Sequence, residues 1–309
     1  MNRLRIATRK SKLALWQAQY AADCLARARP SLEIEMVPLS TRGDQRTDVP
    51  LAEIGGKGLF IKELERALLE DRADIAVHSM KDLPAQLPED LCIASVLPRH
   101  DPRDAFLSDN YSQPEEMPRG AVLGTSSLRR QCLMRHARPD LETRFLRGNV
   151  QTRLRRLDDG DYDAIVLAAS GLDRMDLAKR IRTRLSPEVS LPSVGQGTIG
   201  IECREDLPDL RALLGEVEDA ETAVRTAAER AFNARLQGSC STPIAAYAEL
   251  HGERIHLRGL VGLPDGSRLV QGEREGLQAD AVELGDDLGR EILARGGREI
   301  LAQIQQTAP

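Results

Sequence analysis

The sequence lacks the features that would place it in a membrane or in an oxidising compartment. Its five cysteines are scattered, odd in number and include no CxxC pair, which argues against a disulfide framework or a zinc site. The apolar run at 164–169 is far too short to span a bilayer, and the charged start of the chain leads into no stretch of signal-peptide length. We therefore expect a cytoplasmic protein with no membrane partner.

An excess of positive charge is also missing. Lys and Arg number 43 against 48 Asp and Glu, which gives a net charge of −5 and disfavours nucleic acid as a partner. The 309 residues suffice for two or three domains. With 41% hydrophobic and 29% charged residues, the composition is that of a soluble globular enzyme.

Strand-like and helix-like patterns alternate through the first two thirds of the chain. Leu13, Trp16, Tyr20 and Cys24 recur at the three- and four-residue spacing of one helix face. Such alternation favours α/β domains with largely parallel sheets. The predicted strands are 4–7, 32–36, 74–77, 121–123, 143–146, 163–168 and 198–202, and the predicted helices include 60–68, 127–137 and 150–157.

Two changes of pattern predict the domain limits. The Pro- and charge-rich passage 97–103 marks a crossing into a second α/β domain, and the strand-like run at 198–202 returns the chain to the first. From residue 217 a long helix (220–236), three strand-like runs and closing helices predict a small α+β domain. The expected domains are 1–97 with 198–216, then 98–197, then 217–309.

Arginine is concentrated between residues 129 and 156, where nine arginines accompany no lysine and two acids. Arg129 and Arg130 follow a strand–turn–helix junction at 124–127, and Arg147 lies at a strand end. Free backbone N–H groups and guanidinium forks at such places predict a carboxylate or phosphate site. Phe145 is the single aromatic residue of the stretch, so base stacking is not supported. The arginines interpreted as a solvated helix face are Arg135, Arg138, Arg155 and Arg156.

A second cluster, residues 78–84, follows the predicted strand at 74–77, and strand ends are where open α/β sheets bind ligands. A Ser79–His78–Asp82 triad is disfavoured because the three side chains come from one short segment. A metal site at His78 and Asp82 lacks a third ligand. From the residues alone, Asp82 is either a catalytic carboxylate or the partner of Lys81 in a surface ion pair.

Two loops complete the candidates. Residues 195–200 match a dinucleotide-binding pattern, but the glycines precede a strand instead of opening a helix, so an interdomain crossing with Gln196 available to a ligand is expected. Cys240 lies in a loop of small polar residues, where a bulky group can reach it, whereas the other cysteines lie in helix- or strand-like stretches. Cys240 is therefore the candidate nucleophile or attachment point.

Together these segments resemble the porphobilinogen deaminase family across essentially the whole chain. Cys240 falls at the position of the family's cofactor-bearing cysteine, and Glu53 stands where some relatives have lysine. The matching motifs are residues 6–9, 13–18, 55–60, 76–84, 124–130, 147–150 and 195–197.

The resemblance implies two type II periplasmic-binding-protein-like domains around a cleft and a small α+β domain that carries Cys240. It implies a monomeric transferase of haem and other tetrapyrrole synthesis. That enzyme would deaminate and polymerise four porphobilinogen molecules head to tail on a dipyrromethane cofactor, which a thioether joins to Cys240. Water would then release linear hydroxymethylbilane.

The resemblance also implies roles for single residues. Asp82 would be catalytic, stabilising the cation formed as ammonia leaves and passing protons. Residues 41–58, including Lys57, would form a mobile lid. No metal is implied. The residues implied to hold the cofactor are Ser11, Ser79, Lys81, Asp82, Thr125, Ser127, Arg129, Arg130, Arg153 and Gln196, besides Cys240. Those implied to hold the substrate are Arg9, Lys57, Arg147 and Arg174.

Two other functions fit an arginine-lined cleft. A solute-binding protein would use it for a small anion, and a regulatory module would use it to sense one. The first is expected to carry a signal peptide and gives Cys240 no role, and the second lacks a DNA-binding segment. Both predict reversible binding without a covalent pyrrole or the release of ammonia.

Overall fold

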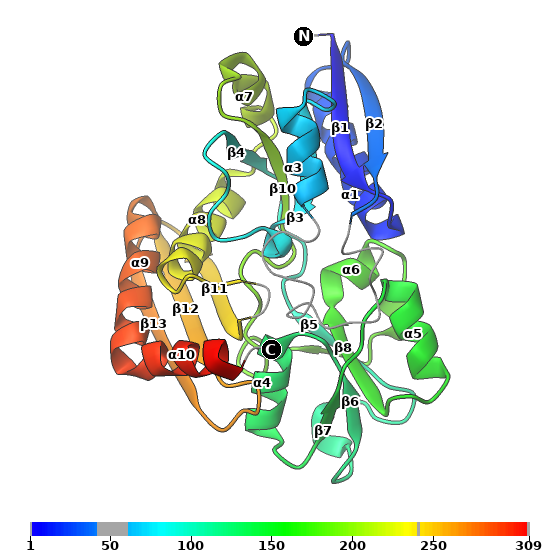
Figure 1. The fold of residues 1–309 in the computed structure, drawn as a ribbon, viewed down its shortest axis with the longest axis vertical. Coiled ribbons are helices and arrows are strands. Elements are labelled where there is room, and N and C mark those ends of the chain that lie inside the picture. Colours follow the sequence, from blue (N-terminus) through cyan, green and yellow to red (C-terminus); the bar gives the residue numbers. More distant parts are fainter. Residues whose placement is uncertain (1, 42–60, 240–241, 308–309) are drawn as a thin grey trace.

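The structure, a computed structural model, describes residues 2–41, 61–239 and 242–307. Three sheets with their helices make up this part of the chain (Figure 1). Its strands are β1 (Arg3–Arg9), β2 (Glu33–Leu39), β3 (Ile75–Ser79), β4 (Leu91–Val96), β5 (Asp104–Leu107), β6 (Val122–Gly124), β7 (Glu142–Arg144), β8 (Ala164–Ala168), β9 (Thr183–Leu185), β10 (Ile199–Arg204), β11 (Ile244–His251), β12 (Arg254–Gly262) and β13 (Leu269–Leu277). Its helices are α1 (Lys12–Ala28), α3 (Lys62–Leu69), α4 (Leu128–Ala137), α5 (Val150–Asp158), α6 (Ala169–Asp173), α7 (Pro208–Gly215), α8 (Ala220–Arg235), α9 (Ala281–Ile292) and α10 (Arg298–Thr307).

The first two sheets repeat one topology. The first has the order β2-β1-β3-β10-β4 and the second the order β7-β6-β8-β5-β9. In each, three parallel strands are followed by an antiparallel strand, β10 or β5, that enters after a crossing between the sheets. The predicted pair of α/β units is confirmed. The segment 97–103 connects β4 of the first sheet to β5 of the second.

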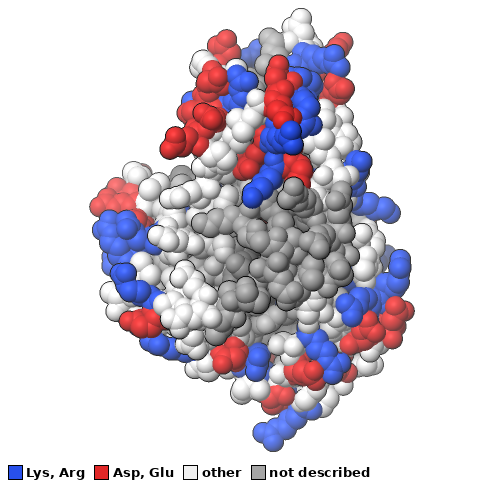
Figure 2. All heavy atoms as spheres, viewed as in Figure 1, with Lys and Arg blue, Asp and Glu red and all other residues white. Residues whose placement is uncertain are grey.

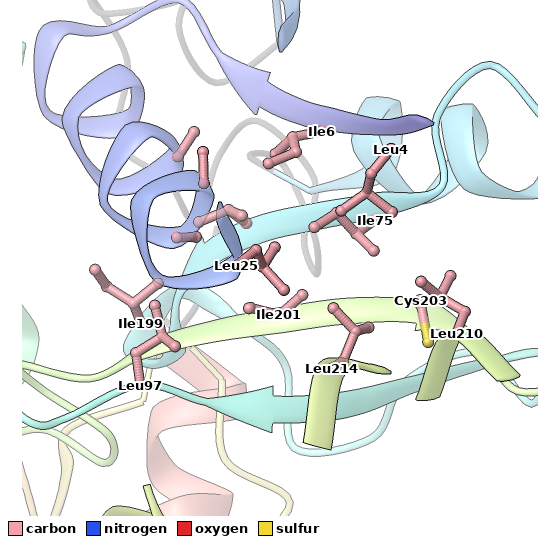
Figure 3. Close-up of a cluster of buried hydrophobic side chains, with 14 of the residues drawn as sticks. Leu4, Ile6, Leu25, Ile75, Leu97, Ile199, Ile201, Cys203, Leu210 and Leu214 are labelled. Carbon is pink, nitrogen blue, oxygen red and sulfur yellow. The ribbon is translucent and has the colours of Figure 1, made fainter. Parts of the chain in front are cut away.

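Burial of one helix face and one sheet face forms the core of the first unit. Ser11 caps α1 by accepting a hydrogen bond from the backbone N–H of Ala14. Each large apolar side chain withdrawn from water here contributes about 1.5–3 kcal/mol. Figure 3 shows the labelled core residues, which come from β1 (Leu4, Ile6), α1 (Leu25), β3 (Ile75), the end of β4 (Leu97), β10 (Ile199, Ile201, Cys203) and α7 (Leu210, Leu214).

The third unit is an antiparallel sheet, β11-β12-β13, covered by α8 and α9. Phe232 of α8 packs against Gly259 of β12, where a Cβ would collide with the phenyl ring. After α9 the chain bends within the segment Leu293–Gly297 at Gly296, whose φ of 109° favours glycine, and α10 follows. This arrangement confirms the small α+β unit predicted from residue 217 onward.

The sequence pattern located most elements and missed three strands. The predicted helices at 127–137, 150–157 and 220–236 are confirmed within one residue at either end. The three strands that were missed are β4, β5 and β9. β5 is a fully buried four-residue strand that begins with an acid, so it shows neither the alternation nor the purely apolar run of an ordinary strand.

Charges of both signs are interspersed on the described part of the face drawn in Figure 2. The described residues include exposed ion pairs such as Arg3–Glu35 and Arg144–Glu142. Such pairs contribute little to stability. Within the described ranges, no helix is long and apolar enough to cross a membrane.

Candidate functional site

A cleft of about 730 Å³ is lined by residues of the first and second α/β units. The carboxyl ends of β1, β3 and β8 contribute to its wall, through Arg9, Ser79 and Ala168. The carboxyl ends of strands are the usual ligand-binding edge of open α/β sheets. Of the predicted site residues, those that line this cleft are Arg9, Ser11, Ser79, Lys81, Asp82, Arg130, Arg147, Arg153 and Arg174.

Three helices begin at the cleft. Ser11 caps α1, Ser127 caps α4 by accepting from the N–H of Arg130, and Asn149 caps α5 by accepting from the N–H of Thr152. The amino ends of these helices add partial positive charge and backbone donors. The cleft is therefore suited to anions independently of its arginines.

Asp82 ends a short 3₁₀ helix (Met80–Asp82) that follows β3 directly. The N–H of Met80 donates to the carbonyl of Thr198, which fixes the start of this turn against the strand returning from the second unit. Within the described part of the chain, the Asp82 carboxylate has neither an ion pair nor a hydrogen bond. A surface ion pair between Lys81 and Asp82, one of the two interpretations left open by the sequence, is not formed.

Lys81, Arg153 and Arg174 are cleft cations that form no ion pair with a described carboxylate. Burial and, to a smaller extent, the positive charge of Arg130 lower the pKa of Lys81 to about 8. The negative charge of Asp82 acts in the opposite direction. Burial and the neighbouring Arg130 and Arg147 lower the pKa of Arg153 to about 10. These groups are cations in an environment that penalises their charge.

Arg174 reaches from the second unit to the first. Its Cζ lies 5.7 Å from the ring centre of Trp16 on α1, and its Nη2 donates to the carbonyl of Gly197 at 2.6 Å. Within the described ranges its Nε atom is buried without a hydrogen-bond partner, and burial lowers the pKa of the guanidinium to about 10.

Arg129 and Arg130 share one internal carboxylate, Asp104 of β5. Nη1 of Arg129 donates to its Oδ2 at 2.8 Å, and Nη2 of Arg130 donates to its Oδ1 at 2.7 Å. Burial would raise the pKa of Asp104, but the two guanidiniums outweigh it and hold that pKa well below its usual range. Both arginines are buried, and of the two only Arg130 lines the cleft.

Gln196 belongs to the same buried network. Its Nε2 donates to Asp104 at 2.9 Å and to the carbonyl of Pro102, and its Oε1 accepts from Lys81 and Arg130. The side chain is completely buried. Gly195 and Gly197, with positive φ, lie in the interdomain crossing predicted there, and a Cβ at Gly197 would collide with the carbonyl oxygen of His100.

Thr125 and Ser127 hold the turn before α4. The N–H of Ser127 donates to Oγ1 of Thr125, and the Ser127 hydroxyl serves as the helix cap. Ser126, which belongs to the predicted anion-binding turn at 124–127 but was not a separate site candidate, lines the cleft. A ligand role for Thr125, Ser127, Arg129 and Gln196 stays a prediction.

Gln17 is a further residue that the sequence reasoning missed. It is 4% exposed, lines the cleft, and donates from Nε2 to the Ser79 hydroxyl at 2.7 Å. The signal was present, because Gln17 lies four residues after Leu13 on an otherwise apolar helix face. Polar residues on such a face are buried and need partners.

Cys240 and Lys57 lie outside the described residues, as does nearly all of the predicted lid at 41–58. The four described cysteines are free thiols. Burial raises the pKa of Cys92, Cys132 and Cys203, and that of Cys132 to about 11, which makes these thiols poor nucleophiles. In the described ranges no group of three His, Cys, Asp or Glu side chains is placed to hold a metal ion.

Two family models match the chain. "Porphobilinogen deaminase, dipyromethane cofactor binding domain" matches residues 4–212, and "Porphobilinogen deaminase, C-terminal domain" matches residues 223–294. The first includes the cleft and the second the sheet β11-β12-β13.

Solved structures similar to this chain include three binding proteins. A putative methionine-binding lipoprotein from Bacillus subtilis is 13% identical, with 72% of this chain and 92% of that chain covered and a TM-score of 0.44. The methionine-binding protein MetQ is 14% identical, with 75% and 95% covered and a TM-score of 0.46. The aliphatic sulphonate binding protein SsuA from Escherichia coli is 14% identical, with 75% and 70% covered and a TM-score of 0.42.

Proposed function

Because this chain belongs to the porphobilinogen deaminase family, we propose that Asp82 is its catalytic residue and that the cleft cations hold the carboxylates of substrate and cofactor. Family membership makes the chain a transferase of tetrapyrrole synthesis, a hydroxymethylbilane synthase. It deaminates four porphobilinogen molecules, joins them on a dipyrromethane cofactor and releases linear hydroxymethylbilane.

Three cations of the cleft carry the proposal. Arg174 is buried, Lys81 and Arg153 are half-buried, and none of them forms an ion pair with a described carboxylate. Burial lowers the pKa of all three groups. Buried charge without a partner is costly, so an anionic ligand that pairs with them gains several charge-assisted hydrogen bonds. Each pyrrole ring of substrate and cofactor carries an acetate and a propionate, which matches this need. A solute-binding protein would share these cations but gives the unpartnered Asp82 no task.

The same residues fit the dipyrromethane. Lys81, Arg130 and Arg153 would hold its carboxylates near Asp82, and Cys240 would bear the thioether. When bound, the group would supply the free pyrrole α-carbon to which the first porphobilinogen is joined. Arg9, Arg147 and Arg174, with the amino ends of α4 and α5, would orient the carboxylates of porphobilinogen.

Asp82 would act on the substrate through its charge. Porphobilinogen loses ammonia to give a pyrrole-stabilised cation, and an oriented carboxylate lowers the energy of that cation relative to the ground state. The same carboxylate can accept hydrogen bonds from pyrrole N–H groups. Because the neighbouring charged groups of the cleft are cations, Asp82 supplies the negative charge that this step requires.

Intact mass under denaturing conditions tests the proposal first. The wild-type chain is expected to exceed its sequence mass by two linked pyrrole units, and Cys240→Ser is expected to show the bare mass. If the wild type is bare, incubation with porphobilinogen is expected to restore the addition. A chain that stays bare after this incubation contradicts the proposal and favours a reversible solute-binding protein.

Arg153→Ala is expected to lower kcat/KM about tenfold or more, because a charge-assisted bond to a carboxylate is lost at each addition. Partly extended chains should accumulate and be visible by mass. Arg155→Ala is the matched control, since Arg155 is exposed on the same helix, α5. Equal kinetics for the two variants, without stalled chains, would place Arg153 outside the ligand site.

We further propose the domain limits 1–97 with 198–216, 98–197 and 217–309, because the strands of each sheet fall within these ranges. A cytoplasmic location is supported by the free thiols of the four described cysteines. A monomer that serves haem synthesis follows the family resemblance, and sedimentation of the holoenzyme tests the oligomeric state.

A further inference from the structure

A small side chamber of about 50 Å³ opens from the cleft beside Asp82. It shares Ser11, Gln17, Ser79 and Asp82 with the cleft wall, so its mouth lies at the proposed catalytic carboxylate. His78 forms part of its lining and is fixed by a 2.8 Å hydrogen bond between its Nε2 and Oε2 of Glu202, which is fully buried. The chamber is thus a preformed feature of the first α/β unit.

The polar lining of the chamber offers hydrogen-bond acceptors. Gln17 uses its Nε2 to donate to Ser79, which leaves its carbonyl oxygen for another group. That oxygen has no hydrogen-bond partner within the described part of the chain, and the same holds for the Asp82 carboxylate. An amide oxygen, a hydroxyl oxygen and a carboxylate therefore surround a space that requires donors.

The size of the chamber selects a small group. One water molecule needs roughly 10–15 Å³ by the same measure, so about 50 Å³ holds a few molecules of that size and no pyrrole ring. The partners that fit are small and rich in N–H or O–H donors. Among the described lining residues, Arg9 is the one with a permanent positive charge, whereas Lys81 lines the cleft but not the chamber.

We propose that this chamber is the leaving-group site, which receives the aminomethyl ammonium of porphobilinogen and the ammonia released from it, through acceptors on Gln17, Ser79 and Asp82. The inference rests on the proposed function, because it assigns a place to one product of that reaction. It gives Gln17 and Ser79 a role toward the substrate amine, separate from the carboxylate contacts made by the arginines.

The chemistry balances at this position. The C–N bond of the substrate ammonium breaks, the electron pair leaves with nitrogen as neutral ammonia, and the positive charge stays on the pyrrole methylene. The proton lost when the new C–C bond forms is taken up by that ammonia, directly or through Asp82, and ammonium departs. Three N–H donors of the ammonium match the three acceptors of the chamber.

The test compares two substrates on the holoenzyme: porphobilinogen and an analogue whose aminomethyl nitrogen carries two methyl groups. The analogue has one N–H donor in place of three and a larger leaving group. Gln17→Ala removes an acceptor and enlarges the chamber. The matched control is Gln19→Ala, because Gln19 is exposed on the same helix and bonds only to Asp23 within the described residues.

Gln17→Ala is expected to lower kcat/KM for porphobilinogen about tenfold or more while leaving the dimethylated analogue unchanged or faster. The ratio of the two kcat/KM values therefore shifts toward the analogue, and Gln19→Ala leaves this ratio unchanged. A loss of equal size on both substrates, or no loss on either, overturns the proposal, because a merely structural role or a chamber that holds only water moves both rates together.

A second variant guards against misfolding. Ser79→Ala removes one acceptor oxygen and replaces Gln17→Ala if that variant does not assemble its cofactor. The ratio of the two kcat/KM values is then expected to shift toward the analogue in Ser79→Ala. An unchanged ratio overturns the proposal. Failure of the enzymatic function itself would look different, since wild-type protein would then release no ammonia from porphobilinogen. Wild-type turnover combined with an unchanged ratio rejects the leaving-group site alone.

Discussion

Asp82→Asn is expected to lower kcat by about 10²- to 10³-fold while the chain keeps its fold and its attached cofactor. The carboxylate has no hydrogen bond or ion pair with a described residue, so the amide removes no interaction that supports the fold. What is lost is the negative charge beside Lys81 and Arg153, at the place where the substrate becomes a cation. Single-turnover and steady-state rates of the holoenzyme measure the effect, with intact mass to verify the cofactor.

Asp206→Asn is the matched control for this experiment. Asp206 pairs with Arg204 on the surface, and the same substitution there should leave turnover within about twofold. If Asp82→Asn with its cofactor in place also turns over at a near-normal rate, Asp82 has no part in the chemistry. The cleft would then act through its cations and helix ends alone.

Asp104→Asn is expected to lower the free energy of unfolding by about 3–5 kcal/mol, the largest stability effect that we foresee for a single substitution. Asp104 is completely buried and accepts hydrogen bonds from Arg129, Arg130, Ser190 and Gln196. Neutralising it leaves two buried guanidiniums without a counter-charge. Denaturant unfolding at neutral pH measures the loss, and Asp206→Asn should cost less than about 1 kcal/mol.

The Asp104 effect also depends on pH in a defined direction. Because the pKa of Asp104 is well below its usual range in the folded state, its contribution is fully present above the unfolded pKa of about 3.9. The contribution is lost as the pH falls below that value toward the folded pKa. The stability difference between wild type and Asp104→Asn should therefore be constant above about pH 5 and shrink in stronger acid. A difference that grows on acidification would contradict the ion-pair assignment.

Local patterns predicted a large part of the site because its main residues lie beside easily recognised elements. Asp82 follows β3 after a single short turn, and Arg147 lies just before α5. The concentration of arginine from 129 to 156 predicted an anion site, and four of the binding candidates lie within it, namely Arg129, Arg130, Arg147 and Arg153. Strand ends and helix starts are set by local sequence, so side chains next to them can be placed in advance.

The arginines show where such reasoning ends. Arg129 and Arg130 are neighbours in sequence with the same apparent role and are both buried, yet of the two only Arg130 lines the cleft. Their counter-ion, Asp104, comes from β5, a strand that the pattern missed. Arg156, interpreted as part of a solvated helix face, lines the cleft while pairing with Asp161. Pairing and burial of a charge depend on segments distant in sequence.

By itself, the sequence determined the two α/β units, the small α+β unit, the crossing at 97–103 and the family, because periodicity and ordered motifs are properties of short segments. Only the tertiary structure decided which cleft cations form no ion pair with a described carboxylate. It also decided that the Gln196 side chain belongs to a buried hydrogen-bond network and that Gln17 donates to Ser79 beside Asp82. These relations join residues 60 or more positions apart. They exist only once packing has brought the strand ends together and excluded water from between them.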